Sequence, residues 1–532
     1  MKKSLLFHQE KGLQAPASLG TALTKVLFAN SPVRRAFSSA ARHSDSTFHD
    51  DVNDPNDSTL TTRAVLSDNG KSVEVHFDEE QTTSLFHSSW LWSVDPNFVH
   101  PTSGQRTRSL ASLYDYKIKS VSTSTELTSY PTPSPGCLHS TGSVYQLSST
   151  TNEGKQRNQA QPRHVLNVVW ERTDNESEYM SQYDMEWLHS RRYDEKALEH
   201  RHQSIEVTPS TALSRERGLT KINFDLLLES DPSKAHFAIL DALFRDGAVL
   251  VTGATPNPDN VESTVGDLAV ALAKRISHGH LYGDIFHVQH IPDAHNIAYT
   301  TVPLPVHQDL AYYTSKPGLQ YLHCVNNKGT VGGESTLLDG LAAATEFKHV
   351  APDLYQILLE CEATFLKQRG NADMVFRRPH IEEDSTGTIT AMHWSPPFER
   401  PLAIDAARVD DYFVAYTAFE RMVNDFLPAD RYILPIDNAL EQQLIDYSRE
   451  YTVERKLQDG DIMIFNNQRM LHGRRSFDVS TDQPTNGRHL VGCYTDIDET
   501  LNQYRLLRRK YFGDLKTPEY MRNPGNGSSS LP

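Results

Sequence analysis

The sequence predicts a mainly β protein with flanking helices, in which a jelly-roll domain over residues 215–515 follows a small β-rich domain over residues 45–210. Many short strand patterns fall within 215–515, and such strands favour a double-sheet jelly roll over a parallel sheet. A separate run of strand patterns lies upstream of residue 210. The chain of 532 residues is also longer than one ordinary domain.

Strand patterns dominate the smaller domain. Residues 73–77 read Val-Glu-Val-His-Phe and alternate apolar with polar side chains, as a half-buried strand does. Residues 165–170 read Val-Leu-Asn-Val-Val-Trp and again favour a strand. Between them, residues 121–163 are rich in Ser, Thr, Pro, Gln and Asn, which bury too little apolar surface to offset chain entropy. We therefore expect a disordered insertion there.

Helix and strand patterns alternate at the start of the larger domain. Residues 235–244 have the apolar spacing of a helix, residues 247–253 form an apolar run bounded by glycines, and residues 261–276 favour a second helix. The glycine-bounded run predicts a buried strand. Further on, short strands and turns dominate, with one more helix expected at 409–425. Residues 516–532 contain a Gly- and Ser-rich end and predict a disordered tail.

The composition argues against several classes of protein. A formal net charge of -16 repels a phosphate backbone, so we expect no nucleic-acid partner. The sequence has no run of roughly 18 or more apolar residues, so we expect no membrane-spanning helix. The four cysteines show no CxxC spacing, which argues against a disulfide framework and against a zinc site built on thiolates.

The first 44 residues differ in composition from the rest. They carry seven Lys and Arg residues against the single acid Glu10, and Ser and Ala are frequent. An Arg-rich, Ser-rich and acid-poor start is typical of a mitochondrial transit peptide, which predicts a location in the mitochondrial matrix. A disordered basic tail on a cytoplasmic protein is the alternative.

The tripeptide His307-Gln308-Asp309 is a candidate for metal binding. Within a strand, residues i and i+2 project from one face, so an imidazole and a carboxylate can reach the same metal. The candidate for a third ligand is His472, which follows a buried strand pattern. Two His and one carboxylate leave three positions open on Fe(II), which suits a bidentate oxo-acid and O2. For the tripeptide alone, a solvated His and Asp at a turn is the alternative.

Several stretches of the chain resemble one known family. They are residues 304–341 (LPVHQDLAYYTSKPGLQYLHCVNNKGTVGGESTLLDGL), 282–289 (YGDIFHVQ), 296–301 (NIAYTT), and 460–475 continuing through 488–494. In one collinear order they resemble the gamma-butyrobetaine dioxygenase branch of the taurine dioxygenase-like superfamily. The resemblance implies a distorted double-stranded β-helix (jelly roll) with Fe(II) at its mouth, held by His307, Asp309 and His472. It further implies 2-oxoglutarate and O2 as co-substrates, with ascorbate as a candidate reductant.

The resemblance also implies a site for 2-oxoglutarate. Arg488 matches the family position that binds the distal carboxylate, a role that suits the planar fork of arginine. Ser335 matches a position where related enzymes place a hydroxyl on the co-substrate. Arg474 and Arg475 are rival anchors, although a surface salt bridge or a solvated position is the expectation for both.

For the substrate, the resemblance implies a cage of aromatic rings around a trimethylammonium group, which has no N–H to donate and is attracted to ring faces. The cage positions are Tyr282, Phe286, Tyr299 and Tyr494, and Asn296 matches a contact to the carboxylate end. Core packing is the alternative for each ring taken singly. Leu310 stands where some relatives have an aromatic residue, so we expect one wall of the cage to be missing. The segment 394–399 also departs from the family pattern on the substrate side.

The smaller domain departs from the family as well. Residues 90–101 resemble a segment that bears three zinc-binding cysteines in the family, but no cysteine stands there. The position of a later His ligand falls near Asn175 or Glu176. Because closed zinc sites of this kind depend on thiolates, we expect the domain to fold without zinc.

The resemblance implies an enzyme that hydroxylates a small trimethylammonium acid, with gamma-butyrobetaine converted to L-carnitine as the leading hypothesis. Trimethyllysine hydroxylation and oxidation of another small acid or secondary metabolite stay open. A different class, a catalytically inactive 2-oxoglutarate-binding protein, is disfavoured by the intact ligand set. The expected partner is a small molecule, and members of this branch often form homodimers.

Overall fold

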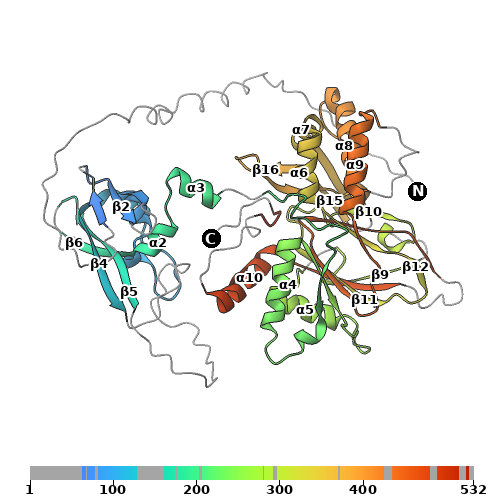
Figure 1. Ribbon diagram of the computed structural model, residues 1–532, viewed down its shortest axis with the longest axis horizontal. Helices are drawn as coiled ribbons and strands as arrows, with labels where there is room; N and C mark the ends of the chain where they lie inside the picture. Colours follow the sequence, from blue (N-terminus) through green and yellow to red (C-terminus); the bar gives the residue numbers. More distant parts are fainter. Residues whose placement is uncertain are drawn as a thin grey trace, which may run out of the picture. The chain divides into compact units, whose positions relative to one another are not determined.

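The structure is a computed structural model in which two regions are described separately, an N-terminal β region and a larger region that carries the pocket (Figure 1). The described residues are 63–67, 69–77, 82–128, 161–174, 177–202, 206–278, 281–291, 296–369, 372–424, 434–479, 488–513 and 523–526. The predicted transit peptide, residues 1–44, lies outside them. Within the described residues, no helix is long and apolar enough to cross a membrane.

The N-terminal β region consists of two three-stranded antiparallel sheets. Their strands are β1 (Arg63–Leu66), β2 (Ser72–Phe77) and β3 (Thr82–His87) in one sheet, and β4 (Tyr116–Thr128), β5 (Gln161–Arg172) and β6 (Glu178–Asp184) in the other. Short helices α1 (Ser88–Ser93), α2 (Met185–Ser190) and α3 (Glu195–His202) complete it. Strand β2 confirms the predicted alternation, because Val73, Val75 and Phe77 are buried in a core that includes Trp92 and Trp170.

The expected insertion is bounded differently in the structure. Residues 121–128 continue strand β4, and residues 161–163 begin strand β5, so the prediction of disorder is wrong at both ends. The two strands pair in register from Tyr116 with Arg172 to Thr128 with Gln161, and this pairing satisfies backbone groups that composition alone does not reveal. Residues 129–160 lie outside the described residues.

Two sheets form the centre of the larger region. The six-stranded sheet has the order β7 (Thr220–Asn223), β8 (Ala248–Thr252), β20 (Ile462–Asn466), β11 (Leu319–Asn326), β23 (His489–Thr495) and β9 (Ile285–Gln289). The four-stranded sheet has the order β10 (Leu304–His307), β21 (Met470–Arg474), β13 (Ser335–Asp339) and β19 (Val453–Arg455). One apolar core contains Met463 and Leu490 from the first sheet and Leu337 from the second. The two sheets therefore share a core, as a double-sheet fold requires.

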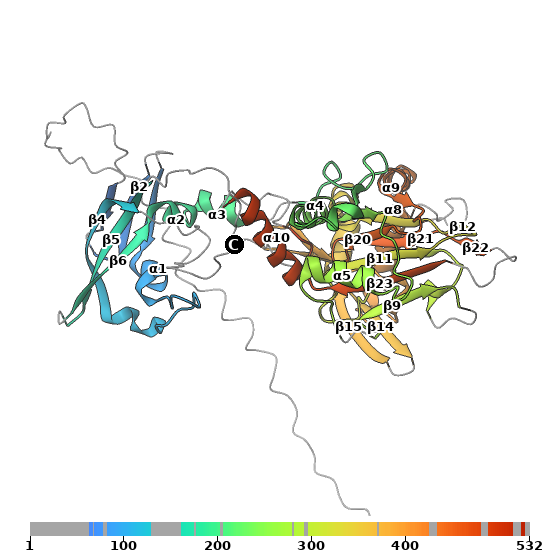
Figure 2. The ribbon, with the colours of Figure 1, turned by 90° about the horizontal axis from the view of Figure 1, so that it is seen from below.

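Helices cover the other face of each sheet. Helices α4 (Ser233–Asp246), α5 (Ser263–Ala273) and α10 (Ile497–Phe512) share a core with the six-stranded sheet (Figure 2). Helices α6 (Gly340–Val350), α7 (Pro352–Glu360), α8 (Val409–Val423) and α9 (Asn438–Tyr451) share a core with the four-stranded sheet (Figure 1). The helices expected at 235–244, 261–276 and 409–425 are confirmed as α4, α5 and α8, and β8 confirms the glycine-bounded strand. The expectation of only one helix in the later part of the chain is wrong, since α6, α7, α9 and α10 also form there.

The remaining strands form small sheets beside the two main ones. They are β12 (Thr330–Gly332) with β22 (Phe477–Val479), β14 (Glu362–Arg369) with β15 (Ala372–Pro379) and β18 (Glu399–Arg400), and β16 (Ile381–Glu383) with β17 (Ile389–Met392).

The C-terminal segment is not entirely a disordered tail. Asn523, Pro524 and Gly525 are buried. The Asn523 side-chain amide donates to the carbonyl of Ile389 at 2.7 Å, and the Asn466 amide donates to the carbonyl of Pro524 at 2.8 Å. The prediction is therefore wrong for residues 523–526, because buried side-chain amides hold this polar segment in place.

Candidate active site

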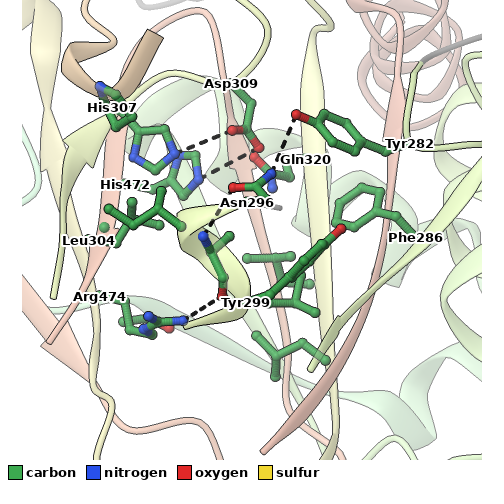
Figure 3. A pocket seen from close by; sticks show the side chains of 18 of the residues that line it. Tyr282, Phe286, Asn296, Tyr299, Leu304, His307, Asp309, Gln320, His472 and Arg474 are labelled. Atoms are coloured by element: carbon green, nitrogen blue, oxygen red, sulfur yellow. Dashed lines mark hydrogen bonds and ion pairs between the residues drawn. The ribbon is translucent and has the colours of Figure 1, made fainter. Parts of the chain in front are cut away.

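Two neighbouring strands bring the candidate metal ligands together. His307 ends β10 and His472 lies in β21, where the two residues are cross-strand partners with ring centroids 4.3 Å apart. Asp309 lies in the turn after β10 and not within the strand. The prediction that His307 and Asp309 reach the same point is therefore confirmed, but the turn brings them together and not the alternation of side chains along a strand. Asn467 fixes that turn, because its side chain accepts from the Asp309 N–H at 2.9 Å and donates to the Asp309 carbonyl at 3.1 Å. The ligand atoms of the three residues all lie within 4.8 Å of one another (Figure 3).

The hydrogen bond of His307 decides which ring nitrogen faces Asp309. Its Nδ1 lies 2.9 Å from the carbonyl of Pro305, which can only accept, so Nδ1 carries the proton in the neutral ring. Nε2 then presents its lone pair, 3.3 Å from an oxygen of Asp309. Nε2 of His472 lies 3.8 Å from the other carboxylate oxygen. The lone pair of His307 Nε2 faces the carboxylate at 3.3 Å and repels it unless a cation lies between them.

The pKa shifts agree with ligands in their metal-binding forms. Burial alone would raise the pKa of the Asp309 carboxyl, but the two nearby imidazoles and the Tyr494 hydroxyl outweigh burial and lower it. Burial, followed by the proximity of His307, lowers the pKa of His472 to about 3. A carboxylate and a neutral imidazole are the forms that bind a divalent metal, so the donor set fits one.

Tyr494 does more than form an aromatic wall. Its hydroxyl donates to Asp309 Oδ2 at 2.7 Å, and burial keeps the pKa of Tyr494 well above its usual range, so the hydroxyl retains its proton. The ring also lies 5.1 Å from that of Phe286. Tyr494 therefore orients a candidate metal ligand, a role that the cage assignment did not include.

One pocket gathers every predicted site residue. The predicted residues among its lining are Tyr282, Phe286, Asn296, Tyr299, His307, Asp309, Ser335, His472, Arg488 and Tyr494. Figure 3 shows the imidazoles and Asp309 on one side and Tyr282, Phe286 and Tyr299 beside them. The lining also includes Tyr312 and Gln320, which were not predicted, Phe398 from the segment 394–399, and Arg474, which was considered only as a rival anchor.

Aromatic residues beyond the predicted cage also line the pocket. Leu310 is buried and adopts a positive φ of 60°, a conformation that costs a non-glycine residue energy. This sharp turn after Asp309 leads to Tyr312, whose hydroxyl lies 3.3 Å from that of Tyr282 and whose ring lies 5.1 Å from that of Phe398. Tyr312 and Phe398 therefore add rings to the lining, while the open wall expected at Leu310 stays a prediction. The sequence signal was the aromatic pair Tyr312-Tyr313, which we did not use.

Arg488 and Ser335 form the polar end of the pocket. Both are buried, with 6% of Arg488 and 4% of Ser335 exposed. Within the described ranges no carboxylate lies within ion-pair distance of Arg488, and burial lowers its pKa to about 10, which leaves it a cation at neutral pH. A buried guanidinium beside a cavity and without a counter-ion is suited to an anionic ligand.

Arg474 is a buried residue, contrary to the surface position expected for it. Only 4% of it is exposed, and its guanidinium donates to the carbonyls of Ala298, Thr300 and Val302 at 2.7–2.8 Å. These carbonyls belong to the loop that carries Asn296 and Tyr299. Arg475 is closer to expectation, because its side chain pairs with Glu454 and is 20% exposed. Arg474 thus links the strand of His472 to the loop on the substrate side.

The fold and the site define a class of protein in which two imidazoles and one carboxylate can hold a divalent metal beside a buried arginine. The family model of the taurine catabolism dioxygenase TauD, TfdA family matches residues 206–494. The chain belongs to this family.

Three curated relatives add detail. The chain is 33% identical over 242 residues to a gamma-butyrobetaine dioxygenase of Pseudomonas sp. (strain AK-1), covering 45% of this chain and 56% of that one. It is 30% identical to dioxygenase str8 of Strobilurus tenacellus, covering 43% and 49%. It is 27% identical to the gamma-butyrobetaine dioxygenase of Homo sapiens, covering 63% and 78%. The chain therefore spans only about half the length of the first two relatives.

Proposed function

We propose that the protein is an Fe(II)- and 2-oxoglutarate-dependent dioxygenase that hydroxylates gamma-butyrobetaine to L-carnitine. The observation that carries the proposal is the composition of one pocket. It combines a two-imidazole, one-carboxylate ligand set, a buried arginine without a counter-ion among the described residues, and several aromatic rings. The pairing of two main sheets supports the finer assignment of the fold as a distorted jelly roll.

His307, Asp309 and His472 would hold the iron. When bound, iron would supply the redox chemistry that couples decarboxylation of 2-oxoglutarate to hydroxylation of a C–H bond by O2. The chain itself prepares these ligands to bind the metal. The carbonyl of Pro305 fixes the tautomer of His307, and the hydroxyl of Tyr494 holds one oxygen of Asp309.

Arg488 would bind the distal carboxylate of 2-oxoglutarate, with the Ser335 hydroxyl as a second donor. A guanidinium binds a carboxylate through two parallel hydrogen bonds, and burial strengthens this pairing because water does not compete. Arg488 enters the pocket from the start of β23 and Ser335 from the start of β13, so the anchor lies where the two main sheets meet the same cavity.

The aromatic part of the pocket would take the trimethylammonium group. Tyr282, Phe286, Tyr299, Tyr312 and Phe398 contribute rings to the lining. Among the described lining residues Asp309 is the only acid, and it already serves the ligand set. An ammonium with N–H groups would therefore lose water without gaining a carboxylate, whereas a quaternary ammonium needs only ring faces, at about 0.5–2 kcal/mol per ring.

A competition assay tests the substrate. The protein with Fe(II), 2-oxoglutarate and O2 is given gamma-butyrobetaine and trimethyllysine together, and both succinate and hydroxylated products are measured. A parallel reaction with 4-(dimethylamino)butyrate tests the need for the quaternary nitrogen. We expect gamma-butyrobetaine to be hydroxylated preferentially. If only a molecule without a quaternary nitrogen couples to succinate, the carnitine assignment fails while the dioxygenase chemistry stands. If no candidate yields succinate, the protein is a 2-oxoglutarate-binding protein without turnover.

A second arm tests the co-substrate anchor. Losing one partner of a buried charge pair costs about 2–5 kcal/mol, so Arg488→Met should raise the KM for 2-oxoglutarate at least about 30-fold. Arg475→Met is the matched control, because this side chain is paired with Glu454 away from the pocket lining. If only the Arg475 variant shows a raised KM for 2-oxoglutarate, then Arg475 and not Arg488 binds its distal carboxylate.

We also propose that residues 1–44 direct the protein to the mitochondrial matrix and that the protein forms a homodimer. The basic, acid-poor composition of this segment supports the first proposal. A fusion of residues 1–44 to a fluorescent protein should reach mitochondria, and a cytoplasmic signal would overturn the first proposal. A sedimentation measurement decides the second, because a single monomeric species would contradict it.

A further inference from the structure

A second cavity lies apart from the pocket that holds the predicted ligands. It has a volume of about 270 Å³, and none of its lining residues also lines the first pocket. Its lining includes Lys316, Arg378, His393 and Glu382, with Thr314 and Ser315 exposed. The space would hold about nine waters at ~30 Å³ each, so it is large enough for a small ligand.

The charges around this cavity do not balance. Lys316 is 6% exposed and Arg378 is 8% exposed, and neither has a carboxylate within ion-pair distance in the described part of the chain. The acid of the lining, Glu382, is bonded at 2.9 Å to Nε2 of His393, and its own side chain is 41% exposed. When Lys316 is protonated, two buried cations face one partly exposed acid and the site carries a net positive charge, which an anion would balance.

Hydrogen-bond donors of both cations remain for a ligand. Lys316 donates to the Gln308 side-chain oxygen at 2.9 Å and to the Met392 carbonyl at 2.6 Å, which uses two of its three N–H groups. Arg378 donates through Nη2 to the carbonyls of Tyr313 and Thr314, and its Nη1 lies 3.5 Å from Nδ1 of His393. These bonds leave one N–H of Lys316 and one N–H of Arg378 Nη1 unused, so each side chain can still donate to an acceptor in the cavity.

From this cavity we propose a binding site for a small oxyanion, such as inorganic phosphate or a short carboxylate. Lys316 and Arg378 would bind its oxygens from the base of the cavity, and the hydroxyls of Thr314 and Ser315 would meet it at the entrance. Burial and the neighbouring Arg378 lower the pKa of Lys316, and a bound anion would favour its charged form. The site also adjoins the metal ligands, because Lys316 bonds to Gln308, which stands between His307 and Asp309.

The test is a calorimetric titration of the full-length protein, purified without added metal, with inorganic phosphate and separately with acetate. The Arg488→Met variant serves as the background, because it removes the anion anchor of the first pocket. We expect saturable phosphate binding in this background, weakened at least about tenfold by Lys316→Met or Arg378→Gln. Arg377→Gln is the matched control, since Arg377 is an exposed neighbour that pairs with Glu362 at 3.3 Å. The two titrations tell a phosphate site from a carboxylate site.

A third variant, Ser315→Asp, tests the proposal even if substitution of the buried Lys316 or Arg378 prevents folding. Ser315 is exposed at the entrance, so the change should leave the fold intact while its carboxylate repels the anion. Binding should then weaken with no change in the unfolding midpoint. No saturable binding would mean that water alone fills the cavity, and binding lost with Arg488→Met alone would place the anion in the first pocket. Either result, or full affinity in the Ser315→Asp variant, overturns the proposal.

Discussion

Asp95 in the N-terminal β region and Asp309 in the pocket are enclosed carboxylates whose neighbours differ in kind. Asp95 accepts hydrogen bonds from the hydroxyls of Ser181 at 2.8 Å and Tyr179 at 2.9 Å, and from the N–H of Asn97 at 3.0 Å. Asp309 has one such donor, Tyr494, and otherwise faces imidazole nitrogens at 3.3 and 3.8 Å. Its side chain is also 20% exposed, whereas that of Asp95 is fully buried.

The positive charges differ in the same way. Arg108 lies 3.5 Å from Asp95, donates to Tyr179 and to the Trp92 carbonyl, and has its guanidinium 3.4 Å from the centre of the Trp92 ring. Its charge is thus matched within the protein. Asp309 has no arginine or lysine within ion-pair distance in the described structure. The neighbours of Asp95 supply protons and close the site, while those of Asp309 supply lone pairs and leave it suited to a metal.

The largest expected effect follows from removing a lone pair at the pocket. His472→Ala should lower Fe(II)-dependent succinate release by more than about 100-fold, because even outer partners of metal ligands are worth 10–100-fold in affinity or activity. The metal-free variant should still fold with a modestly lower unfolding midpoint, because the change removes ring packing against His307 and Phe465 together with the close approach of Nε2 to Asp309. His349→Ala, on an exposed position of α6, is the control. Wild-type turnover in the His472 variant would remove it from the ligand set.

Breaking the closed cluster should affect stability and leave metal binding intact. Asp95→Ala would leave Arg108 buried without its counter-ion, a change that typically costs about 3–5 kcal/mol. Denaturation followed by tryptophan fluorescence would report it, because Trp92 and Trp170 lie in the same core. The double variant Asp95→Leu, Arg108→Met should recover part of the loss. If Asp95→Ala destabilises no more than Asp174→Ala, an exposed control, then the cluster is not what holds this region together.

Sequence reasoning worked for the site where chemistry required particular residue types in particular motifs. His307, Asp309, His472 and Arg488 were predicted because few residues can bind a metal or a carboxylate, and the structure brings them to one pocket. The cluster around Asp95 could not be predicted, since its partners come from residues 84 and 86 positions away in the chain. Residues 90–101, which contain Asp95, were interpreted only as lacking the zinc-binding cysteines of the family. That observation predicts the absence of zinc but does not indicate which side chains fill the place of a metal.

For the fold as well, features marked by a local sequence pattern were predicted, and features that depend on residues distant in the chain were not. Strands β2 and β8 were predicted because apolar alternation or glycine boundaries mark a strand locally. Helix α6 was missed because an unbroken apolar run, residues 341–344, hides the helical period of its first turns, as is typical of a helix buried on most sides there. The burial of Arg474 and of the C-terminal residues depends on carbonyls and amides that only the tertiary structure brings near.

A smaller effect is expected from Arg474, a positioning residue that connects strand β21 to the loop at residues 298–302. Arg474→Lys should raise the KM for the organic substrate about tenfold, because an ammonium cannot span three carbonyls and one hydrogen bond from a charged group is worth about 1.5–3 kcal/mol. The KM for 2-oxoglutarate should stay within about twofold, since Arg488 is untouched. Steady-state kinetics with each substrate varied separately measures this split. Equal rises in both KM values would indicate a general distortion of β21.

Removing the metal should have no effect on the stability of the N-terminal β region. This prediction distinguishes Asp95 from Asp309 most directly, because only Asp309 is expected to bind a metal. A chelator such as EDTA should strip Fe(II) from the pocket and abolish turnover, yet leave the unfolding of the N-terminal β region unchanged. The reason is that Asp95 already has its protons and its counter-ion from Ser181, Tyr179 and Arg108, so a metal has no lone pair left to bind. The predicted histidine position near Asn175 and Glu176 lies outside the described residues, so the metal content must be measured. Elemental analysis should find almost no zinc in purified protein, and stoichiometric zinc lost together with the fold of this region would refute the prediction.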